Sequence, residues 1–374
     1  MNRPTVEIRK IDSYDLSVIE EAVTSFFSGI KSHKINHCKR VLIKPNALGA
    51  YPPERAVTTH PIVLEAIIRY FLDRKKEIWF GDSSGGSVSF ENVWQTCGYS
   101  SLAEKYHLKV VNFSTLGFRE LSYKDKKIKI SEALFRCGII INVGKYKTHQ
   151  LTAFTGALKN LYGFVPGLVK SEYHRLYPDT NSFAELLTAL YAVIGNRITY
   201  SIIDGIMGMD GNGPSAGKPH HFGLLFGSTS IPAVDYIASH IMGFQLKDVP
   251  YLSSVLIMDG ILPSQIKIPV SFRNYRISDA DINNVKIIQK TLKYVPDIAR
   301  KAFRKVYYFY PVISERCKQC GICVKSCPVK AISLQNKTKP YIHKEQCIKC
   351  LCCYELCPYQ AIDIKKSILA RLGV

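Results

Sequence analysis

The chain has 374 residues, of which 47% are hydrophobic, and a formal net charge of +20. That length predicts about two or three domains with a substantial core, and no apolar run reaches the roughly 18 to 20 residues of a membrane-spanning helix. The amino-terminal segment has alternating charges and no apolar signal region, so we expect a cytoplasmic protein with no transmembrane segment. The basic balance suits an acidic partner, but no nucleic-acid-binding motif accompanies it, and nucleic acid is not an expected ligand.

Residues 1–290 alternate short β-branched apolar runs with longer helical patterns. Such alternation is typical of an α/β domain with a mostly parallel sheet. The expected strands are Arg40–Ile43, Glu77–Gly81, Lys109–Phe113, Gly138–Val143, Thr199–Ile203 and Phe222–Phe226. Two helical candidates lie between them: Pro61–Leu72, which begins with a proline, and Ser182–Ile194, which Ser182 would cap.

Polar side chains follow four of these strands at the point where each one ends. They are Lys44 and Asn46, then Asp82, then Lys145, Lys147 and His149, and then Asp204. Because the carboxyl ends of parallel strands meet at one edge of a sheet, we expect these groups to form one site. The lysines, with the nearby Lys159, would suit a carboxylate or a phosphate, whereas the alternative for any one lysine is a solvated basic surface.

A basic and aromatic stretch, residues 291–312, connects this domain to the rest of the chain. We interpret it as a linker helix that packs on the main domain, because an amphipathic face usually meets a core. A membrane-surface or partner helix is the alternative, since lysine and arginine alternate there with phenylalanine and tyrosine. Peripheral membrane contact therefore stays open.

Residues 313–366 contain a duplicated cysteine motif. CKQCGICVKSCP at 317–328 is followed 30 residues later by CIKCLCCYELCP at 347–358. Three cysteines at i, i+3 and i+6 can wrap one [4Fe-4S] cluster, while the fourth, which precedes proline, ligates the other cluster of the pair. The spacing predicts a small α+β domain of the bacterial ferredoxin type with two clusters. One would be held by Cys317, Cys320, Cys323 and Cys357, and the other by Cys347, Cys350, Cys353 and Cys327.

Zinc is the main alternative for these cysteines, but two copies of a four-cysteine run that ends in Cys-Pro fit it poorly. Cys352 is an additional cysteine where the first copy has Ile322. We interpret it as a small buried hydrophobic residue, and a ligand exchange is the alternative. Cys38, Cys97 and Cys137 stand alone in the sequence and are expected in the core.

Several long motifs are similar to those of a known family. They are IKPN at 43–46, TTHP at 58–61, GDSSGG at 81–86, GKYKTHQLTAFTGALKNLYGFVPG at 144–167 and DGIMGMDGNGP at 204–214. From about residue 40 to 360 the chain resembles the bacterial and archaeal DUF362 proteins, including members that carry a C-terminal pair of ferredoxin motifs. The resemblance implies an iron–sulfur protein and adds Asn160 to the candidate site residues.

We expect an iron–sulfur oxidoreductase in which the α/β domain binds an anionic small molecule and the ferredoxin-type domain delivers electrons to it. The candidate catalytic residues are His149, Asp82 and Lys145. The candidate substrate-binding residues are Lys44, Asn46, Lys147, Lys159, Asn160 and Asp204. The basic surface favours an acidic ferredoxin or flavodoxin as the electron donor. A non-catalytic electron-transfer protein and a redox-sensing binding protein are the alternatives.

Overall fold

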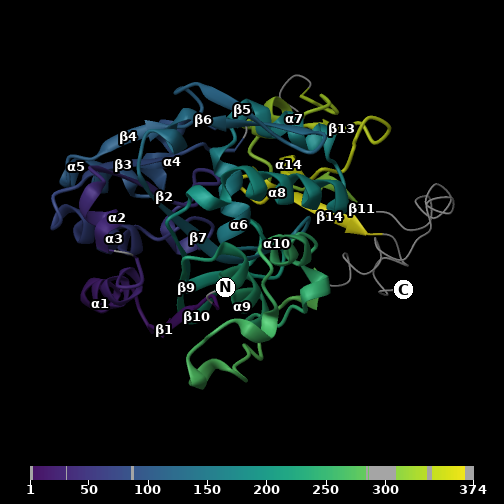
Figure 1. Cartoon of the computed structure of the whole chain (residues 1–374). Coiled ribbons are helices and arrows are strands. Elements are labelled where there is room, and N and C mark those ends of the chain that lie inside the picture. Colours follow the sequence, from purple (N-terminus) through teal and green to yellow (C-terminus); the bar gives the residue numbers. More distant parts are fainter. Residues whose placement is uncertain are drawn as a thin grey trace.

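The structure, a computed structural model, describes residues 3–30, 32–85, 88–283, 285, 309–334 and 339–366. A mixed, mostly parallel sheet of eight strands forms the centre of the N-terminal domain (Figure 1). Its order is β1-β10-β9-β7-β2-β3-β4, and the short β8 pairs with the end of β7. The strands are β1 (Glu7–Lys10), β2 (Arg40–Lys44), β3 (Glu77–Asp82), β4 (Lys109–Asn112), β7 (Ile139–His149), β8 (Ala153–Thr155), β9 (Tyr200–Asp210) and β10 (Lys218–Ser228).

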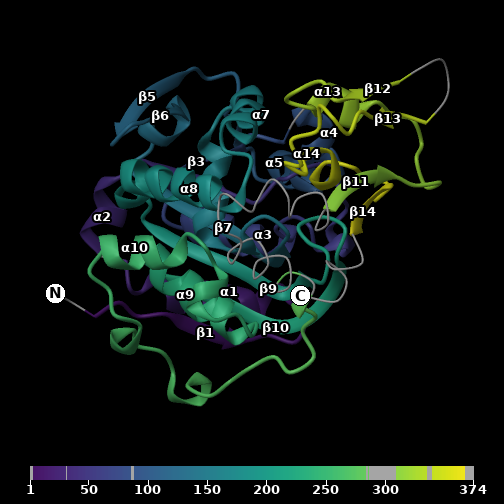
Figure 2. The same cartoon turned by 90° about the vertical axis from the view of Figure 1, so that its right-hand side faces the viewer.

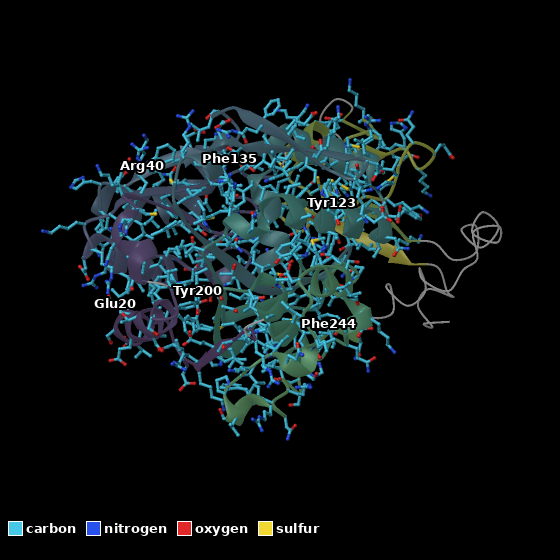
Figure 3. All side chains as sticks on the ribbon, viewed as in Figure 1. Glu20, Arg40, Tyr123, Phe135, Tyr200 and Phe244 are labelled. Carbon is cyan, nitrogen blue, oxygen red and sulfur yellow. The ribbon has the colours of Figure 1, made fainter. Side chains whose placement is uncertain are left out.

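Helices cover both faces of this sheet. One face carries α1 (Leu16–Phe27), α2 (Ser32–His37), α3 (Pro61–Leu72), α4 (Phe90–Thr96) and α5 (Tyr99–Lys105). The other carries α6 (Ala157–Asn160), α7 (Gly167–Leu176), α8 (Thr180–Ile194), α9 (Ile231–Ile241), α10 (Leu252–Met258) and a hairpin of β5 (Phe118–Tyr123) and β6 (Lys126–Ser131). Tyr200, labelled in Figure 3, is buried on the first face, where its ring contacts Phe26 and Phe27 of α1.

The C-terminal domain is a small lobe at one end of the N-terminal domain (Figure 2). It contains two short antiparallel pairs, β11–β14 and β12–β13, and two short helices that carry cysteines. Their bounds are β11 (Phe309–Ile313), α13 (Ile322–Ser326), β12 (Ile332–Ser333), β13 (Tyr341–Ile342), α14 (Cys352–Glu355) and β14 (Ile362–Lys366). This pairing of two similar halves agrees with the sequence duplication and with the expected small α+β domain.

The expected architecture of a mostly parallel α/β domain followed by a ferredoxin-like domain is confirmed. All six expected strands are present, and the helix expected over Pro61–Leu72 has those bounds. α8 begins two residues before the predicted Ser182, because Asp179 accepts hydrogen bonds from the N–H groups of Asn181 and Ser182 and acts as the N-cap.

Two strands are longer than predicted, and this changes the placement of the polar residues. β7 continues past Val143 to His149, and β9 continues past Ile203 to Asp210. The polar side chains in these extensions are buried and have hydrogen-bonding partners inside the protein. Lys145 and Lys147 therefore do not end β7.

The expected linker helix falls mostly outside the described residues. Residues 286–308 are not described, and residues 309–312 form part of β11, which pairs with β14. The end of the predicted linker is therefore a strand and not a helix, since its aromatic and β-branched residues suit a paired, half-buried backbone. Within the part of the chain that the structure describes, no helix combines the length and the apolar character needed to cross a membrane.

Candidate functional site

A pocket lies between the carboxyl ends of the central parallel strands and helix α14 of the C-terminal domain. It encloses about 700 Å³, including the part that is open to solvent. Six of the residues predicted from the sequence line it: Asn46, Asp82, Lys147, His149, Lys159 and Asn160. The C-terminal domain contributes Cys352, Glu355 and Leu356. The site is therefore formed by both domains together.

Helix α6 presents Lys159 and Asn160 to the pocket, and a buried carboxylate fixes its position. Asp235 on α9 accepts hydrogen bonds from the backbone N–H groups of Ala157 at 2.6 Å and Leu158 at 3.1 Å. These amides belong to the first turn of α6, where N–H groups have no partner within the helix. Asp235 thereby serves as a cap supplied from a distant part of the chain.

Asn160 connects the end of β2 to β7. Its Oδ1 accepts hydrogen bonds from Asn46 Nδ2 at 3.0 Å and from Lys44 Nζ at 3.3 Å. Its Nδ2 donates to Asn142 Oδ1 at 2.8 Å. Asn46 in turn accepts a hydrogen bond from Lys147 Nζ at 3.1 Å. This network holds the base of the pocket in one arrangement, as preorganised sites require.

Two lysines that border the pocket donate to backbone carbonyl groups and form no ion pair with a described carboxylate. Lys147 Nζ donates to the carbonyl oxygen of Val57 at 2.6 Å, and Lys170 Nζ donates to that of Ser83 at 2.6 Å. Burial, with a contribution from nearby lysines, lowers the pKa of Lys147 well below its usual value. Burial also lowers the pKa of Lys170 to about 7. An anion in the pocket would raise the pKa of both lysines and favour their charged forms.

Lys159 has an ammonium group that forms no hydrogen bond and no ion pair with any residue that the structure describes. Its Nζ lies 5.5 Å from the ring centre of Tyr162 and 5.6 Å from that of Phe183. Burial lowers its pKa, while nearby Glu355 and Cys352 act in the opposite direction. A desolvated cation without a partner is costly, so this position is suited to an anionic ligand.

His149 is a neutral hydrogen-bond donor on the pocket wall. Its Nδ1 accepts hydrogen bonds from the N–H groups of Leu151 at 3.1 Å and Thr152 at 3.4 Å, which assigns the ring proton to Nε2. Burial and the neighbouring Lys159 lower the pKa of His149 well below its usual value. Its Nε2 lies 3.3 Å from Oε1 of Glu355, across the boundary between the two domains.

Four buried polar atoms at the pocket wall have no hydrogen-bond partner in the described part of the chain. They are His149 Nε2, Thr155 Oγ1, His174 Nδ1 and Glu355 Oε1. Burial lowers the pKa of His174 to about 3, so this ring is also neutral. Because folded proteins pair nearly all buried polar atoms, this group indicates the position of a bound molecule or of ordered water.

Asp82 borders the pocket as a carboxylate that already has several partners. Its Oδ1 accepts a hydrogen bond from the Ser83 N–H at 2.8 Å and lies 3.0 Å from Lys44 Nζ, while its Oδ2 accepts from the Ala47 N–H at 3.1 Å. Lys44 lies behind it and does not line the pocket. This geometry favours a role in fixing the strand ends over the proton transfer expected for Asp82.

Lys145 and Asp204 lie outside the pocket lining. Both are fully buried, with Nζ and Oδ2 separated by 2.7 Å, and the hydroxyl of Tyr14 donates to Asp204 Oδ1 at 3.0 Å. The pair connects neighbouring strands β7 and β9. The geometry gives no support to the catalytic role predicted for Lys145 or to the substrate-binding role predicted for Asp204.

The sequence did not identify several residues that line the pocket or hold α14 against the N-terminal domain. For one group of them, the two cysteine copies differ in a way that the sequence shows. The second cysteine copy has Cys352, Tyr354 and Glu355 where the first has Ile322, Val324 and Lys325. These substitutions lie in the copy that packs on the N-terminal domain. The Tyr354 hydroxyl donates to the carbonyl oxygen of Asn212 at 2.6 Å, and the Tyr51 hydroxyl donates to that of Glu355 at 3.2 Å. Lys170, His174 and Thr155 had no such signal.

The eight motif cysteines line two separate cavities in the C-terminal domain. One is lined by Cys317, Cys320, Cys323 and Cys357, and the other by Cys327, Cys347, Cys350 and Cys353. Backbone N–H groups donate to Sγ of Cys317, Cys327 and Cys357 at 3.2 to 3.4 Å. Thiolates and N–H donors of this kind fit iron–sulfur clusters. Among the described residues, no three His, Cys, Asp or Glu side chains are grouped closely enough to hold a single metal ion.

The two cavities differ in their exposure. Cys320 is exposed, whereas Cys350 and Cys353 are buried. We call the cavity that contains Cys320 the outer cavity and the one that contains Cys350 the inner cavity. The inner cavity shares the lining residue Cys352 with the pocket.

Comparisons with known proteins match the N-terminal and the C-terminal parts of the chain to two different family models. A family model described as a domain of unknown function, DUF362, matches residues 41–240, and one described as a 4Fe-4S dicluster domain matches residues 316–361. The chain is 31% identical over 216 residues to the thylakoid-associated protein sll1697 of Synechocystis. That match covers 58% of this chain and 66% of the relative, slightly less than two thirds of its length.

Two solved structures show weaker similarity. A Thermotoga maritima protein has a TM-score of 0.39 and 15% identity, with 56% of this chain and 55% of that chain covered. The lactate racemase apoprotein of Thermoanaerobacterium thermosaccharolyticum has a TM-score of 0.41 and 11% identity, with 64% and 57% covered. Similarities at this level carry no functional argument.

Proposed function

The chain belongs to the DUF362 family, and we propose that it is an iron–sulfur oxidoreductase with two [4Fe-4S] clusters, which reduces or oxidises an anionic small molecule held in the pocket between its domains. The observation that carries this proposal is the position of α14. This helix lies between cysteines of the motif and also forms one wall of the pocket, through Cys352 and Glu355. The inner cavity and the pocket therefore share a wall, to which Cys352 contributes.

The clusters, once bound by the eight motif cysteines, would supply or accept one electron at a time. Lys159 and Lys147 bind and orient the anion, since Lys147 is buried and Lys159 partly buried, and neither has a carboxylate partner among the described residues. His149 presents its Nε2–H group to the pocket and can donate a hydrogen bond to the ligand from that atom. The buried walls exclude water, which strengthens each of these electrostatic interactions.

We propose that the electron donor is an acidic ferredoxin or flavodoxin that docks over the outer cavity. Cys320 is exposed, and the exposed lysines Lys318, Lys325 and Lys330 belong to the same cysteine copy. Association with such a carrier should weaken as salt is added, because the contact depends on exposed charges. Reduction at a rate that does not respond to ionic strength would remove this part of the proposal.

The proposal is tested by anaerobic purification of the full-length protein, followed by mass spectrometry of the small anions that co-purify with it. The matched control is Lys159→Gln, which removes the unpaired cation. An anion found with the wild type and lost with the variant supports the pocket assignment.

A second variant separates the alternative functions. Cys320→Ala should abolish turnover of the captured anion if electrons pass through the clusters, and unchanged turnover in the folded variant would exclude an oxidoreductase role for them. Capture of the anion without turnover in the wild type would favour a redox-sensing binding protein. Electron transfer to a partner protein with no captured anion would favour a non-catalytic carrier.

A further inference from the structure

The β7–β8 pair presents three hydrogen-bond donors to the pocket from one face. Lys147 on β7 lies directly opposite Thr155 on β8 in the antiparallel register, so both side chains project from the same face. His149 lies two residues after Lys147 on β7 and therefore shares that face. All three line the pocket, and the Thr155 hydroxyl and His149 Nε2 have no hydrogen-bond partner among the described residues. Two donors on this wall are thus unused.

Helices α6 and α7 add further groups to the same pocket. His174 lies four residues after Lys170, so both are on one face of α7, and both line the pocket. The ring of Phe183 supports His174 at a centre-to-centre distance of 4.7 Å and lies 5.6 Å from Nζ of Lys159 on α6. The buried Nδ1 of His174 has no partner in the described part of the chain. A neutral imidazole can carry its proton on Nδ1 and donate from that atom.

The charges around the pocket favour a ligand with two negative charges. The lysines and acidic residues among the described lining residues are Lys147, Lys159, Lys170, Asp82 and Glu355. Asp82 is compensated by Lys44, whose Nζ lies 3.0 Å from Oδ1. With the three lysines charged and Glu355 ionised, a balance of two positive charges is left for the ligand. A phosphate monoester carries about two negative charges near neutral pH.

The geometry of the donors favours a phosphate group over a carboxylate. No arginine is among the described lining residues, and the planar fork of arginine is the group that matches a planar carboxylate. The donors come instead from β7, β8, α6 and α7, which suits an anion whose oxygens accept from several directions. The pocket volume of about 700 Å³, including its open part, exceeds one phosphate group and leaves room for an organic part.

We propose that the anion in this pocket is the phosphate group of a phosphorylated small molecule, which Thr155, His149 and His174 recognise through their unpartnered polar atoms. The three lysines supply the compensating charge, and the organic part of the molecule occupies the rest of the pocket. This inference rests on the proposed function, since it names the class of the anion.

The test is titration calorimetry at pH 7 on the full-length protein after anaerobic cluster assembly. The probes are glycerol 3-phosphate, phenyl phosphate, inorganic phosphate and malonate. Malonate carries its two negative charges on planar carboxylates and so controls for charge. Both esters should bind at least about tenfold more tightly than malonate, because the phosphate group gains additional charge-assisted hydrogen bonds.

Two variants test the recognising atoms. Thr155→Val removes the hydroxyl but keeps a branched side chain, and His174→Phe removes the ring nitrogens but keeps an aromatic ring against Phe183. Each should weaken ester binding by about tenfold and malonate binding less, because each loses a hydrogen bond to a charged group. The matched control is Thr180→Val, which removes a buried hydroxyl that also lacks a described partner but lies outside the pocket lining. It should bind every probe as the wild type does.

Malonate that binds as tightly as the esters would overturn the inference, as would an unchanged ratio of ester to malonate affinity in both Thr155→Val and His174→Phe. Binding of inorganic phosphate with rejection of both esters would make this a site for the free anion and would also overturn it. Failure of the proposed function looks different. Selective ester binding by a protein whose clusters exchange no electrons with the captured anion supports the inference alone, whereas turnover of a captured carboxylate supports the proposed function alone. A wild type that captures no anion and binds no probe overturns both.

Discussion

His149 on β7 and Glu355 on α14 face each other across the domain boundary, with Nε2 and Oε1 3.3 Å apart. Neither atom has a hydrogen-bond partner among the described residues, so the two are close without hydrogen-bond geometry. Lys159 lies in the same pocket with an unpaired ammonium group. A small molecule with anionic and polar groups could pair with His149, Glu355 and Lys159 together.

Removing single charges at this boundary should change anion affinity in opposite directions. Sulfate serves as the probe, measured by titration calorimetry on the cluster-loaded protein. Lys159→Gln should weaken sulfate binding by about tenfold or more, and Glu355→Gln should tighten it by about tenfold, since one unit charge at short range in a partly buried site contributes more than about 1.4 kcal/mol. Equal effects of the two variants on affinity would show that sulfate binds elsewhere.

Sulfate affinity should also fall as the pH rises from 6 to 8. The pKa of Lys170 is about 7 because of its burial, so its ammonium form is lost over this range, while the charge of sulfate stays constant. The titratable groups that act electrostatically on Lys170 or respond to it include Asp82, Lys44, Lys159 and His174. Lys170→Arg should weaken the pH dependence, because arginine stays charged. A Glu355→Gln background excludes a contribution from that carboxyl group, and an unchanged slope in Lys170→Arg would refute the assignment.

Gly163 is predicted to be essential for the Lys44–Asp82 ion pair. A Cβ atom at this position would overlap both Oδ1 of Asp82 and Nζ of Lys44. Gly163→Ala should therefore lower the free energy of unfolding by about 3 to 5 kcal/mol, the range for a broken buried pair. Gly29→Ala is the matched control, because its Cβ would meet the Phe26 carbonyl oxygen at an ordinary 3.5 Å. Equal stability of the two variants in chemical denaturation would contradict this.

Lys145 and Asp204 are predicted to stabilise the fold without binding the ligand. Asp204→Asn leaves a fully buried ammonium group without its carboxylate, so the free energy of unfolding should fall by about 3 to 5 kcal/mol. The Kd for sulfate should stay unchanged in the folded variant. Glu77→Gln breaks a surface pair with Arg40 and should leave the free energy of unfolding nearly unchanged. A large loss of sulfate affinity in Asp204→Asn would place this pair back in the site.

Much of the fold could be predicted because hydrophobic periodicity is a local property. The strand over Arg40–Ile43 is apolar after its first residue and the helix over Pro61–Leu72 is amphipathic, and both lie where expected. The ends of β7 and β9 could not be predicted in the same way. Lys145 and Lys147 are polar in the sequence, but distant residues provide their partners, so only the folded structure shows that they belong to a buried strand.

The site was predictable only in part, for a similar reason. The rule that parallel strands present their carboxyl ends on one edge correctly grouped Asn46, Lys147 and His149. It could not show that Lys145 points to a different partner from Lys147, because that depends on which side chains face each strand. Glu355 was missed because the difference between the two cysteine copies does not show, without the fold, that the second copy packs against another domain.

The most direct measurement of the central claim is a single-turnover experiment. The clusters of the full-length protein are reduced anaerobically, excess reductant is removed, and the anion captured by the wild-type protein is added while the clusters are followed by absorbance and EPR. The account predicts that the clusters become oxidised as a reduced form of the anion appears in mass spectrometry, and that Lys159→Gln slows both by about tenfold or more. The reverse reaction is tested by adding the reduced form of the anion to the oxidised clusters. If the reduced clusters stay reduced with the captured anion bound, and the oxidised clusters also stay oxidised in the reverse reaction, the proposed electron transfer is contradicted.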